Sequence, residues 1–188
     1  HVIANPLVEL QFHELTVKSN LIGLYNANNI SAAITIGTYF EVTDKDIKEA
    51  IESYIPENNR SQLLNKNSNE IILDAYNANP SSMLVALQNF LQLDKTDKVI
   101  IIGDMFELGE ESLAEHQSIV NYLKSNESVA CYFIGNDFYS NKVEQSNFSF
   151  YKDFDSFAAF LQSSKFKNNA ILIKGSRGMA LERVLEYI

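Results

Sequence analysis

The sequence predicts an α/β protein whose larger, later part is built on an open, mainly parallel β-sheet. From residue 70 onward, short runs of Val, Ile and Phe alternate with helical patterns. Continuous apolar runs of this kind are typical of strands that are buried on both faces of a sheet. With 188 residues, 46% of them hydrophobic, the chain is also long and apolar enough to bury a core.

The first part of the chain is expected to contribute two short strands and a helix. Apolar and polar residues alternate in Leu7 to Phe12 and again around Leu15 to Val17, with a tight turn between them. Apolar residues at helical spacing then predict a helix from about Ile30 to Phe40.

A second helix and a linker are expected next. Thr43 stands three residues before Asp46, which is typical of a helix N-cap followed by an acid in the first turn, and Pro56 ends the pattern. The polar, turn-rich segment 56–61 is predicted to be a linker. We therefore expect one domain over residues 1–60 and another over residues 61–188.

Strands and helices alternate in the second domain. The expected strands are 71–73, 99–102, 129–134, 148–151 and 170–173. The expected helices are 80–93, 112–124, 154–162 and 180–187, and the Asn/Ser-rich stretch 65–69 is expected to be a loop. Asn79 and Pro80 predict the N-cap and first residue of the helix that they open.

Four of these strands end in residues suited to a ligand site. They are followed by Asp74, by Gly103-Asp104, by Gly135-Asn136-Asp137 and by Lys174-Gly175-Ser176-Arg177-Gly178. Ligands of open α/β sheets bind outside the carboxyl ends of the strands, so the sequence predicts a site at this edge. Asp74, followed by a helix N-terminus, suits an anionic ligand and can accept from a sugar hydroxyl or bind a metal.

The glycine-rich segment 175–178 is not a P-loop, because Lys and Ser or Thr do not directly follow its second glycine, and no other stretch of the sequence supplies one. His116, within a predicted helix, is expected to be a surface or interface residue.

Composition narrows the classes of function. A net charge of −9 with scattered basic residues argues against nonspecific nucleic-acid binding. No run is long enough for a membrane span, and there is no secretion signal. The single cysteine, Cys131, lies in an apolar run, so we expect a buried structural thiol and a reducing, cytoplasmic compartment. The chain starts at His1 in the middle of a pattern, and we expect it to be part of a longer protein.

Three polar residues have two interpretations each. Asn26 and Asn29 could cap the first helix or read the edge of a purine base, because an amide offers both a donor and an acceptor. Arg60 could be a solvated linker cation or a clamp for phosphate oxygens.

Four motifs together resemble the Mur ligase family, and within it the ligases that add D-Ala-D-Ala during peptidoglycan synthesis. They are Gly23-Leu24-Tyr25-Asn26-Ala27-Asn28-Asn29, Asp74-Ala75-Tyr76-Asn77-Ala78-Asn79-Pro80, Gly103-Asp104-Met105-Phe106-Glu107-Leu108-Gly109 and Lys174-Gly175-Ser176-Arg177. The first motif departs from the family pattern, since Tyr25 replaces a common His.

The resemblance implies an ATP-dependent ligase that forms an amide bond through an acyl phosphate, with UDP-N-acetylmuramoyl-tripeptide, D-Ala-D-Ala and ATP as substrates and Mg²⁺ as cofactor. Residues 1–60 would be the end of the central ATP-binding domain, and residues 61–188 the C-terminal Rossmann-like ligase domain. The P-loop and the Mg²⁺ ligands would lie upstream of His1, so this chain is expected to hold no metal site, to be inactive alone and to act within a monomeric enzyme.

The resemblance also implies roles for individual residues. Asn26 and Asn29 would lie at the adenine, and Arg60 and Asp74 would reach the phosphates and ribose. Tyr76 and Asn77 would lie at the domain interface near the reacting groups. The candidates for D-Ala-D-Ala are Asn136, Ser176 and Arg177, with Arg177 suited to its carboxylate.

Two alternatives stay open. A ligase for another amino acid, or one of the folylpolyglutamate synthase type, would share the fold, although the segment Tyr76-Asn77-Ala78-Asn79 argues against both. A receiver-like signalling module would need two acids at its first strand end and a phosphoacceptor Asp at its third, which this sequence lacks.

Overall fold

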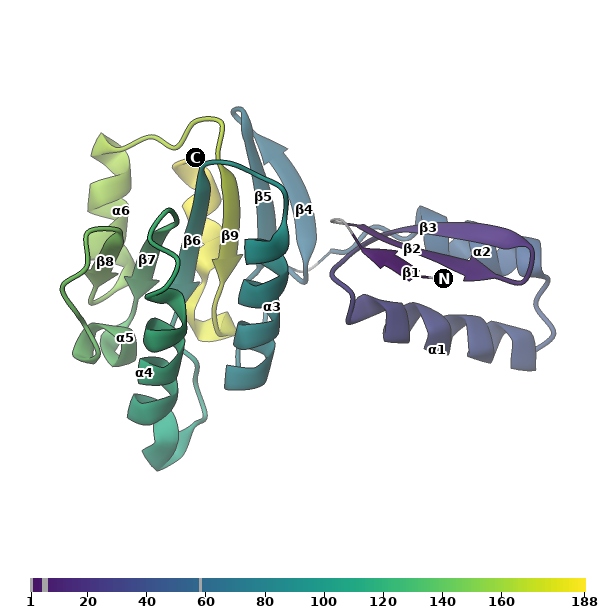
Figure 1. The fold of residues 1–188 in the computed structure, drawn as a ribbon, viewed down its shortest axis with the longest axis horizontal. Helices are drawn as coiled ribbons and strands as arrows, with labels where there is room; N and C mark the ends of the chain where they lie inside the picture. The colour runs from purple at the N-terminus through teal and green to yellow at the C-terminus, as the bar shows by residue number, and fades with distance from the viewer. Residues whose placement is uncertain (1, 5–6, 58) are drawn as a thin grey trace. The chain divides into compact units, whose positions relative to one another are not determined.

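The computed structural model describes residues 2–4, 7–57 and 59–188. The chain divides into two compact units, His1–Glu57 and Asn58–Ile188 (Figure 1). The boundary falls inside the predicted linker 56–61, of which Asn58 lies outside the described residues. Which domains of a larger enzyme these units represent stays a prediction.

The first unit is a three-stranded antiparallel sheet with two helices. The sheet has the order β1-β2-β3, with β1 at Val2–Ala4, β2 at Leu7–Phe12 and β3 at Leu15–Ile22. Helix α1 spans Asn26–Tyr39 and helix α2 spans Asp44–Ser53. The Thr43 side chain accepts from the backbone N–H of Asp46, which confirms the predicted N-cap.

The core of this unit lies between one face of β2, where every second residue is apolar, and the apolar side of α1. Val8, Leu10 and Phe12 lie on one face of β2, and Ile30 and Ile34 of α1 pack in the same cluster. Helix α1 begins at Asn26, four residues earlier than the apolar pattern predicts.

The second unit is built on a six-stranded sheet. Its strands, in chain order, are β4 Gln62–Lys66, β5 Asn69–Asp74, β6 Lys98–Gly103, β7 Ala130–Ile134, β8 Phe148–Tyr151 and β9 Ala170–Lys174. They lie in the order β4-β5-β9-β6-β7-β8, and every pairing except β4 with β5 is parallel. The predicted open, mainly parallel α/β sheet is therefore confirmed.

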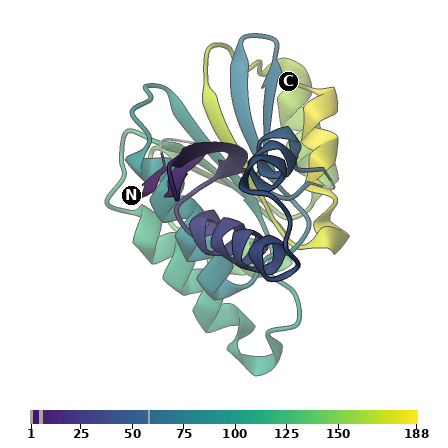
Figure 2. The same ribbon diagram turned by 90° about the vertical axis from the view of Figure 1, so that its right-hand side faces the viewer.

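Helices cover both faces of this sheet. They are α3 Pro80–Gln92, α4 Ser112–Leu123, α5 Asn136–Ser140 and α6 Phe154–Ser163, with 3₁₀ helices η1 Gly109–Glu111, η2 Arg177–Met179 and η3 Leu181–Glu186. Helices α3 and α4 lie on one face and α6 and η3 on the other, as the two views in Figures 1 and 2 show. Alternate strand residues such as Ile71, Val99 and Ile171 pack with Phe157 and Leu181 on the second face.

Several elements differ from the sequence prediction, among them strand β1 and the 3₁₀ helix η1, which were not predicted. The stretch 65–69 is not a loop but a hairpin between β4 and β5, with Asn67 and Ser68 at positive φ in its turn. The short helix α5 was not predicted. The segment expected to be a helix over 180–187 is 3₁₀ rather than α, and it buries Leu181 and Val184 completely.

The strand order also excludes the receiver-like alternative. Receiver modules have the order 2-1-3-4-5, with the first strand inside the sheet. Here the last strand, β9, lies between β5 and β6, which are the first two parallel strands of the chain.

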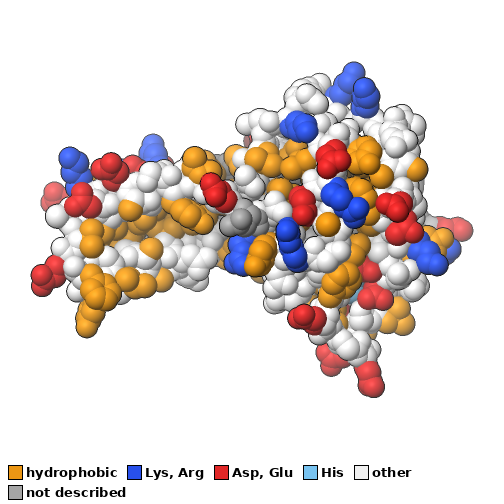
Figure 3. All heavy atoms as spheres, turned by 180° about the vertical axis from the view of Figure 1, so that it is seen from behind, with side chains coloured by type: hydrophobic (Ala, Val, Ile, Leu, Met, Phe, Trp, Pro, Cys, Tyr) orange, Lys and Arg blue, Asp and Glu red, His pale blue; other side chains and the backbone are white. Residues whose placement is uncertain are grey.

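The surface carries charges of both signs. On the face that Figure 3 shows, Lys and Arg side chains are interspersed with Asp and Glu over the larger unit. None of the helices in the described part of the chain is long and apolar enough to cross a membrane.

Candidate functional site

The four polar strand ends form one continuous edge of the second unit. Strands β5, β9, β6 and β7 are neighbours in this order and run parallel, so their carboxyl ends all lie at the same edge of the sheet. This is the edge at which open α/β sheets bind ligands. The adjacency follows from the position of β9, which the sequence alone does not give.

Asp74 and Lys174 form an ion pair at this edge. They are direct register partners at the ends of β5 and β9. Lys174 Nζ donates to Asp74 Oδ2 at 2.6 Å and to the Asn77 carbonyl at 3.0 Å, and the backbone N–H of Ser61 donates to Asp74 Oδ1 at 3.1 Å. The Lys174 side chain is 2% exposed and that of Asp74 17%, so the carboxylate keeps a solvent-facing side.

Arg60 lies over the ring of Tyr76. The guanidinium carbon is 3.8 Å from the ring centroid, and both side chains are exposed. Stacking of this kind engages the flat face of the guanidinium and leaves its N–H edge available to oxygen atoms. The structure therefore brings three of the predicted residues, Arg60, Asp74 and Tyr76, to the segments that flank one strand end.

The N-terminus of α3 is less suited to an anion than the sequence indicates. Asn79 and Ser82 form a capping box, in which the Asn79 side chain accepts from the Ser82 backbone N–H at 2.8 Å. Pro80 has no N–H to offer. The cap satisfies donors that an anion would use, so the chemistry at this strand end rests on Asp74, Lys174 and Arg60.

Ser176 has a structural role at the same edge. It is 5% exposed, and its Oγ accepts from the Phe106 N–H at 2.9 Å and lies 3.5 Å from the Ala78 carbonyl, to which it donates. One hydroxyl thus joins the segments that follow β5, β6 and β9. Ser176 holds the edge together, and its Oγ is already engaged on both sides.

The other two dipeptide candidates are exposed. Arg177 donates to Glu182 Oε1 at 3.1 Å, and its side chain is 60% exposed. Asn136 is the first residue of α5, at the end of β7. Strand β6 separates the strands that these two residues follow.

A buried polar cluster underlies the Asn136 segment. The Asp104 carboxylate accepts from the backbone N–H groups of Asp137 and Phe138, both at 3.0 Å. It lies against Gly135, where any side chain would collide with it, because a Cβ there would be 2.2 Å from the carboxylate carbon. Burial raises the pKa of Asp104, and the two N–H donors offset part of that rise.

The prediction that His116 is a surface or interface residue is wrong, since His116 is completely buried within the second unit. Its Nε2 accepts from the Met105 N–H at 3.0 Å, and its Nδ1 lies 2.7 Å from the Ser112 carbonyl, to which it donates. Both ring nitrogens therefore support the neutral tautomer with the proton on Nδ1. This histidine anchors the segment after β6 to α4.

The asparagine pair belongs to the first unit. Asn26 is 6% exposed, its Nδ2 donates to the Ile22 carbonyl at 2.7 Å, and its Oδ1 accepts from Asn29 Nδ2 at 2.8 Å. Neither side chain caps α1. Asn26 thus fixes the orientation of the exposed Asn29, whose Oδ1 and second amide hydrogen form a donor and acceptor pair.

Lys174 stands in one of the four motifs, but no role of its own was predicted for it from the sequence. One signal marks it in the sequence, a charged residue at the end of a wholly apolar strand. Its partner could not be identified in this way, because Asp74 lies 100 positions away. Among the described residues, no three His, Cys, Asp or Glu side chains are grouped so as to hold a metal ion.

Comparisons with known proteins point to one family. Residues 59–177 match the family described as Mur ligase, glutamate ligase domain. The UDP-N-acetylmuramoyl-tripeptide D-alanyl-D-alanine ligase of Rickettsia prowazekii is 30% identical over an alignment of 171 positions that covers 86% of this chain and 36% of that protein. The corresponding ligase of Borreliella burgdorferi is also 30% identical over an alignment of 171 positions, which covers 88% of this chain and 37% of that protein.

A solved structure shows the same fold. A MurF from Acinetobacter baumannii superposes with a TM-score of 0.84 at 25% identity, over 99% of this chain and 43% of that one. The chain thus spans little more than a third of the length of the two curated relatives named above. On the family match over residues 59–177, the chain belongs to the Mur ligase family.

Proposed function

We propose that this chain forms the later part of an ATP-dependent ligase that joins D-Ala-D-Ala to UDP-N-acetylmuramoyl-tripeptide in cytoplasmic peptidoglycan synthesis. Family membership and the two ligases at 30% identity support the reaction class. The single observation that carries the proposal is the arrangement of Arg60, Asp74 and Lys174 at the carboxyl end of β5.

These residues fit a nucleotide. Asp74 is held by Lys174 and Ser61 with a side open to solvent, and a carboxylate held in this way accepts hydrogen bonds from ribose hydroxyls. Arg60 presents an N–H edge that can bind two phosphate oxygens at once. In the first unit, Asn29 offers the donor and acceptor that an adenine edge requires. Tyr76 and Asn77 are exposed, and we assign them to the surroundings of the reacting groups.

ATP would supply the phosphoryl group that converts the tripeptide carboxylate into an acyl phosphate. The amine of D-Ala-D-Ala then attacks the acyl carbon, the C–O bond to phosphate breaks, and the nitrogen loses a proton as the amide forms. The chain's own residues contribute by orienting the nucleotide and the amine. We propose that Mg²⁺ assists this transfer and is bound by ligands outside residues 1–188.

We assign the dipeptide carboxylate to Arg177. Its guanidinium is exposed and already pairs with a carboxylate, that of Glu182, which a substrate carboxylate can replace. Asn136 lies on the same edge of the sheet and is assigned to the dipeptide backbone. Ser176 contributes by fixing the segments that carry these residues.

The test compares alanine variants of Arg60, Asp74 and Arg177 in the full-length protein. Arg60→Ala is expected to lower kcat/KM for ATP by roughly 10- to 100-fold, because a hydrogen-bonded contact to a charged group is lost. Asp74→Ala is expected to act in the same direction, and Arg177→Ala to raise the KM for D-Ala-D-Ala selectively. Steady-state kinetics with each substrate varied in turn measures all three.

A matched control is Arg183→Ala. Arg183 is also exposed and also lies over an aromatic ring, that of Phe154 at 3.9 Å, and we assign it no substrate. It is expected to keep the wild-type KM for ATP. Wild-type protein that forms product with L-glutamate but not with D-Ala-D-Ala would replace this proposal with that of a different amino-acid ligase.

A further inference from the structure

Lys174 is a buried cation at the edge of the site. Lysine is among the residues least often buried, because removing an ammonium from water is costly unless it is paired and hydrogen-bonded. Here the side chain is 2% exposed, and its two acceptors are Asp74 Oδ2 at 2.6 Å and the Asn77 carbonyl at 3.0 Å. A lysine buried in this way holds both acceptors in fixed positions.

The two acceptors come from one short segment. Asp74 is the last residue of β5, and Asn77 lies in the turn that leads from this strand to α3. Because Lys174 and Asp74 are register partners on adjacent strands, the ammonium meets the carboxylate directly. Its bond to the Asn77 carbonyl then fixes the turn, including Tyr76, over whose ring Arg60 lies.

The Asp74 carboxylate is held from two sides as a result. Lys174 binds Oδ2 and the Ser61 N–H binds Oδ1, and Ser61 directly follows Arg60. Each carboxylate oxygen accepts more than one hydrogen bond, so both oxygens retain capacity for a ligand. Without Lys174, the carboxylate would keep only the Ser61 contact and could rotate.

We propose that Lys174 is a positioning residue for nucleotide use, which orients the Asp74 carboxylate and the turn that carries Tyr76. The inference rests on the proposed function, since it assigns Lys174 to the nucleotide that Asp74 and Arg60 bind. Lys174 itself makes no contact with the nucleotide and acts through Asp74 and Asn77.

The test is a double-mutant cycle in the full-length protein. Lys174→Met is expected to raise the KM for ATP by about 100-fold, as for a misplaced binding group, with a much smaller change in the KM for D-Ala-D-Ala. In the double variant Asp74→Asn with Lys174→Met, the loss is expected to be no larger than that of the more severe single variant. Additive losses, or an unchanged KM for ATP in Lys174→Met, would overturn the proposal.

Lys98→Met is the matched control. Lys98 is also partly buried and donates to a backbone carbonyl, that of Leu91 at 2.6 Å, but it begins β6 and so lies at the opposite edge of the sheet. It is expected to lose thermal stability without a change in the KM for ATP. A rise in that KM equal to the one in Lys174→Met would reduce the role of Lys174 to general stability.

A second variant covers loss of folding. Lys174→Gln retains a hydrogen-bond donor without the charge, and it takes the place of Lys174→Met in the cycle if circular dichroism shows that the latter is unfolded. The same experiment distinguishes failure of the proposed function from failure of the positioning role. If the proposed function is wrong, the wild-type protein itself forms no amide product with D-Ala-D-Ala. A wild-type enzyme that is active and a folded Lys174→Gln variant with unaltered KM for ATP would refute the positioning role alone.

Discussion

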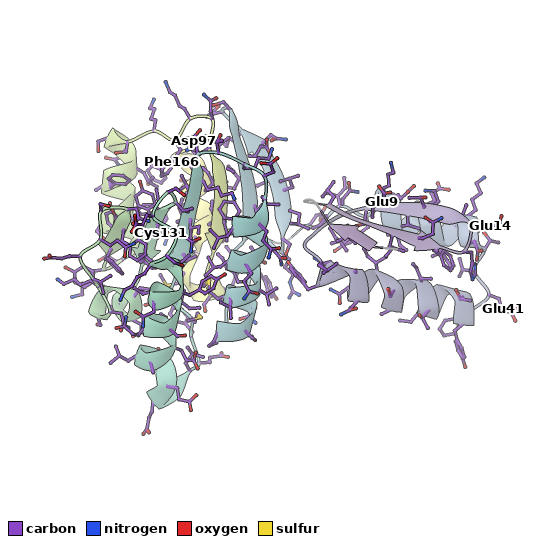
Figure 4. All side chains as sticks on the ribbon, in the orientation of Figure 1. Glu9, Glu14, Glu41, Asp97, Cys131 and Phe166 are labelled. Atoms are coloured by element: carbon purple, nitrogen blue, oxygen red, sulfur yellow. The ribbon has the colours of Figure 1, made fainter. Side chains whose placement is uncertain are left out.

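Cys131 shows how burial alone decides the chemistry of a residue. It lies within β7 in the interior of the second unit, where Figure 4 labels it, and it is 1% exposed. Burial raises the pKa of its thiol to about 12, so almost no thiolate, the reactive form, exists near neutral pH. The expected buried structural thiol therefore has a physical basis in the fold.

Native protein is accordingly expected to resist alkylation by iodoacetamide at about pH 8, while protein unfolded in guanidinium is modified at Cys131. Mass spectrometry of the intact protein measures both states, with glutathione as the reference thiol. Modification of the native protein at the rate of glutathione would contradict the buried environment. Because the chain has a single cysteine, the readout is unambiguous.

Individual residues also show which roles cannot be predicted from sequence motifs. Asp74 could be selected from the sequence because it ends an apolar strand, whereas Arg60 was selected only through the family resemblance. The role of Ser176 could not be predicted, because its Oγ contacts come from the backbone near Ala78 and Phe106, at least 70 positions away. The burial of His116 likewise depends on the segment after β6, which contacts it only once the sheet is assembled.

At the scale of elements, the parallel strands and the main helices were predictable, but the order of the strands in the sheet was not. Each parallel strand is a short apolar run, and this pattern fixes its existence. The insertion of β9 between β5 and β6 depends on long-range pairing, and it alone makes Asp74 and Lys174 neighbours. Strand β4 was missed because its residues are mostly polar, as is usual for a strand at the edge of a sheet.

Asp104, which follows β6, predicts that the stability of the fold depends on pH. The pKa of Asp104 is raised chiefly by burial, so the folded state binds its proton up to a higher pH than the unfolded chain does. This contribution to stability is complete below the ordinary carboxyl pKa of 3.8, and it is lost as the pH rises through the raised value. The free energy of unfolding of the wild-type protein is therefore expected to decrease as the pH rises through the raised pKa of Asp104.

Asp104→Asn removes the titrating group and is expected to remove that part of the slope. The substitution is also expected to lower the free energy of unfolding by about 1–3 kcal/mol. The amide oxygen can replace only one carboxylate oxygen, so the N–H of either Asp137 or Phe138 loses its acceptor. Urea unfolding between about pH 4 and 8 measures both effects. Identical slopes in the two proteins would show that Asp104 does not titrate differently in the folded state.

At the scale of the whole molecule, the two units differ in how completely they bury their apolar residues. The second has its own core between its six-stranded sheet and the helices α6 and η3. The first has a small core and leaves several large apolar side chains exposed, among them Tyr39 at 80%, Phe40 at 71% and Ile55 at 66%. Short chains bury a smaller fraction of their surface and gain less from folding.

Residues 58–188 expressed alone are therefore expected to fold, with one cooperative thermal transition followed by circular dichroism. Residues 1–57 expressed alone are expected to be largely unfolded or to associate through their exposed apolar residues. The isolated second unit retains Arg60, Asp74 and Lys174 but lacks Asn29. If Asn29 reads adenine, this unit binds ATP and GTP with similar affinity in calorimetry, whereas a clear preference for ATP would place adenine recognition within residues 58–188.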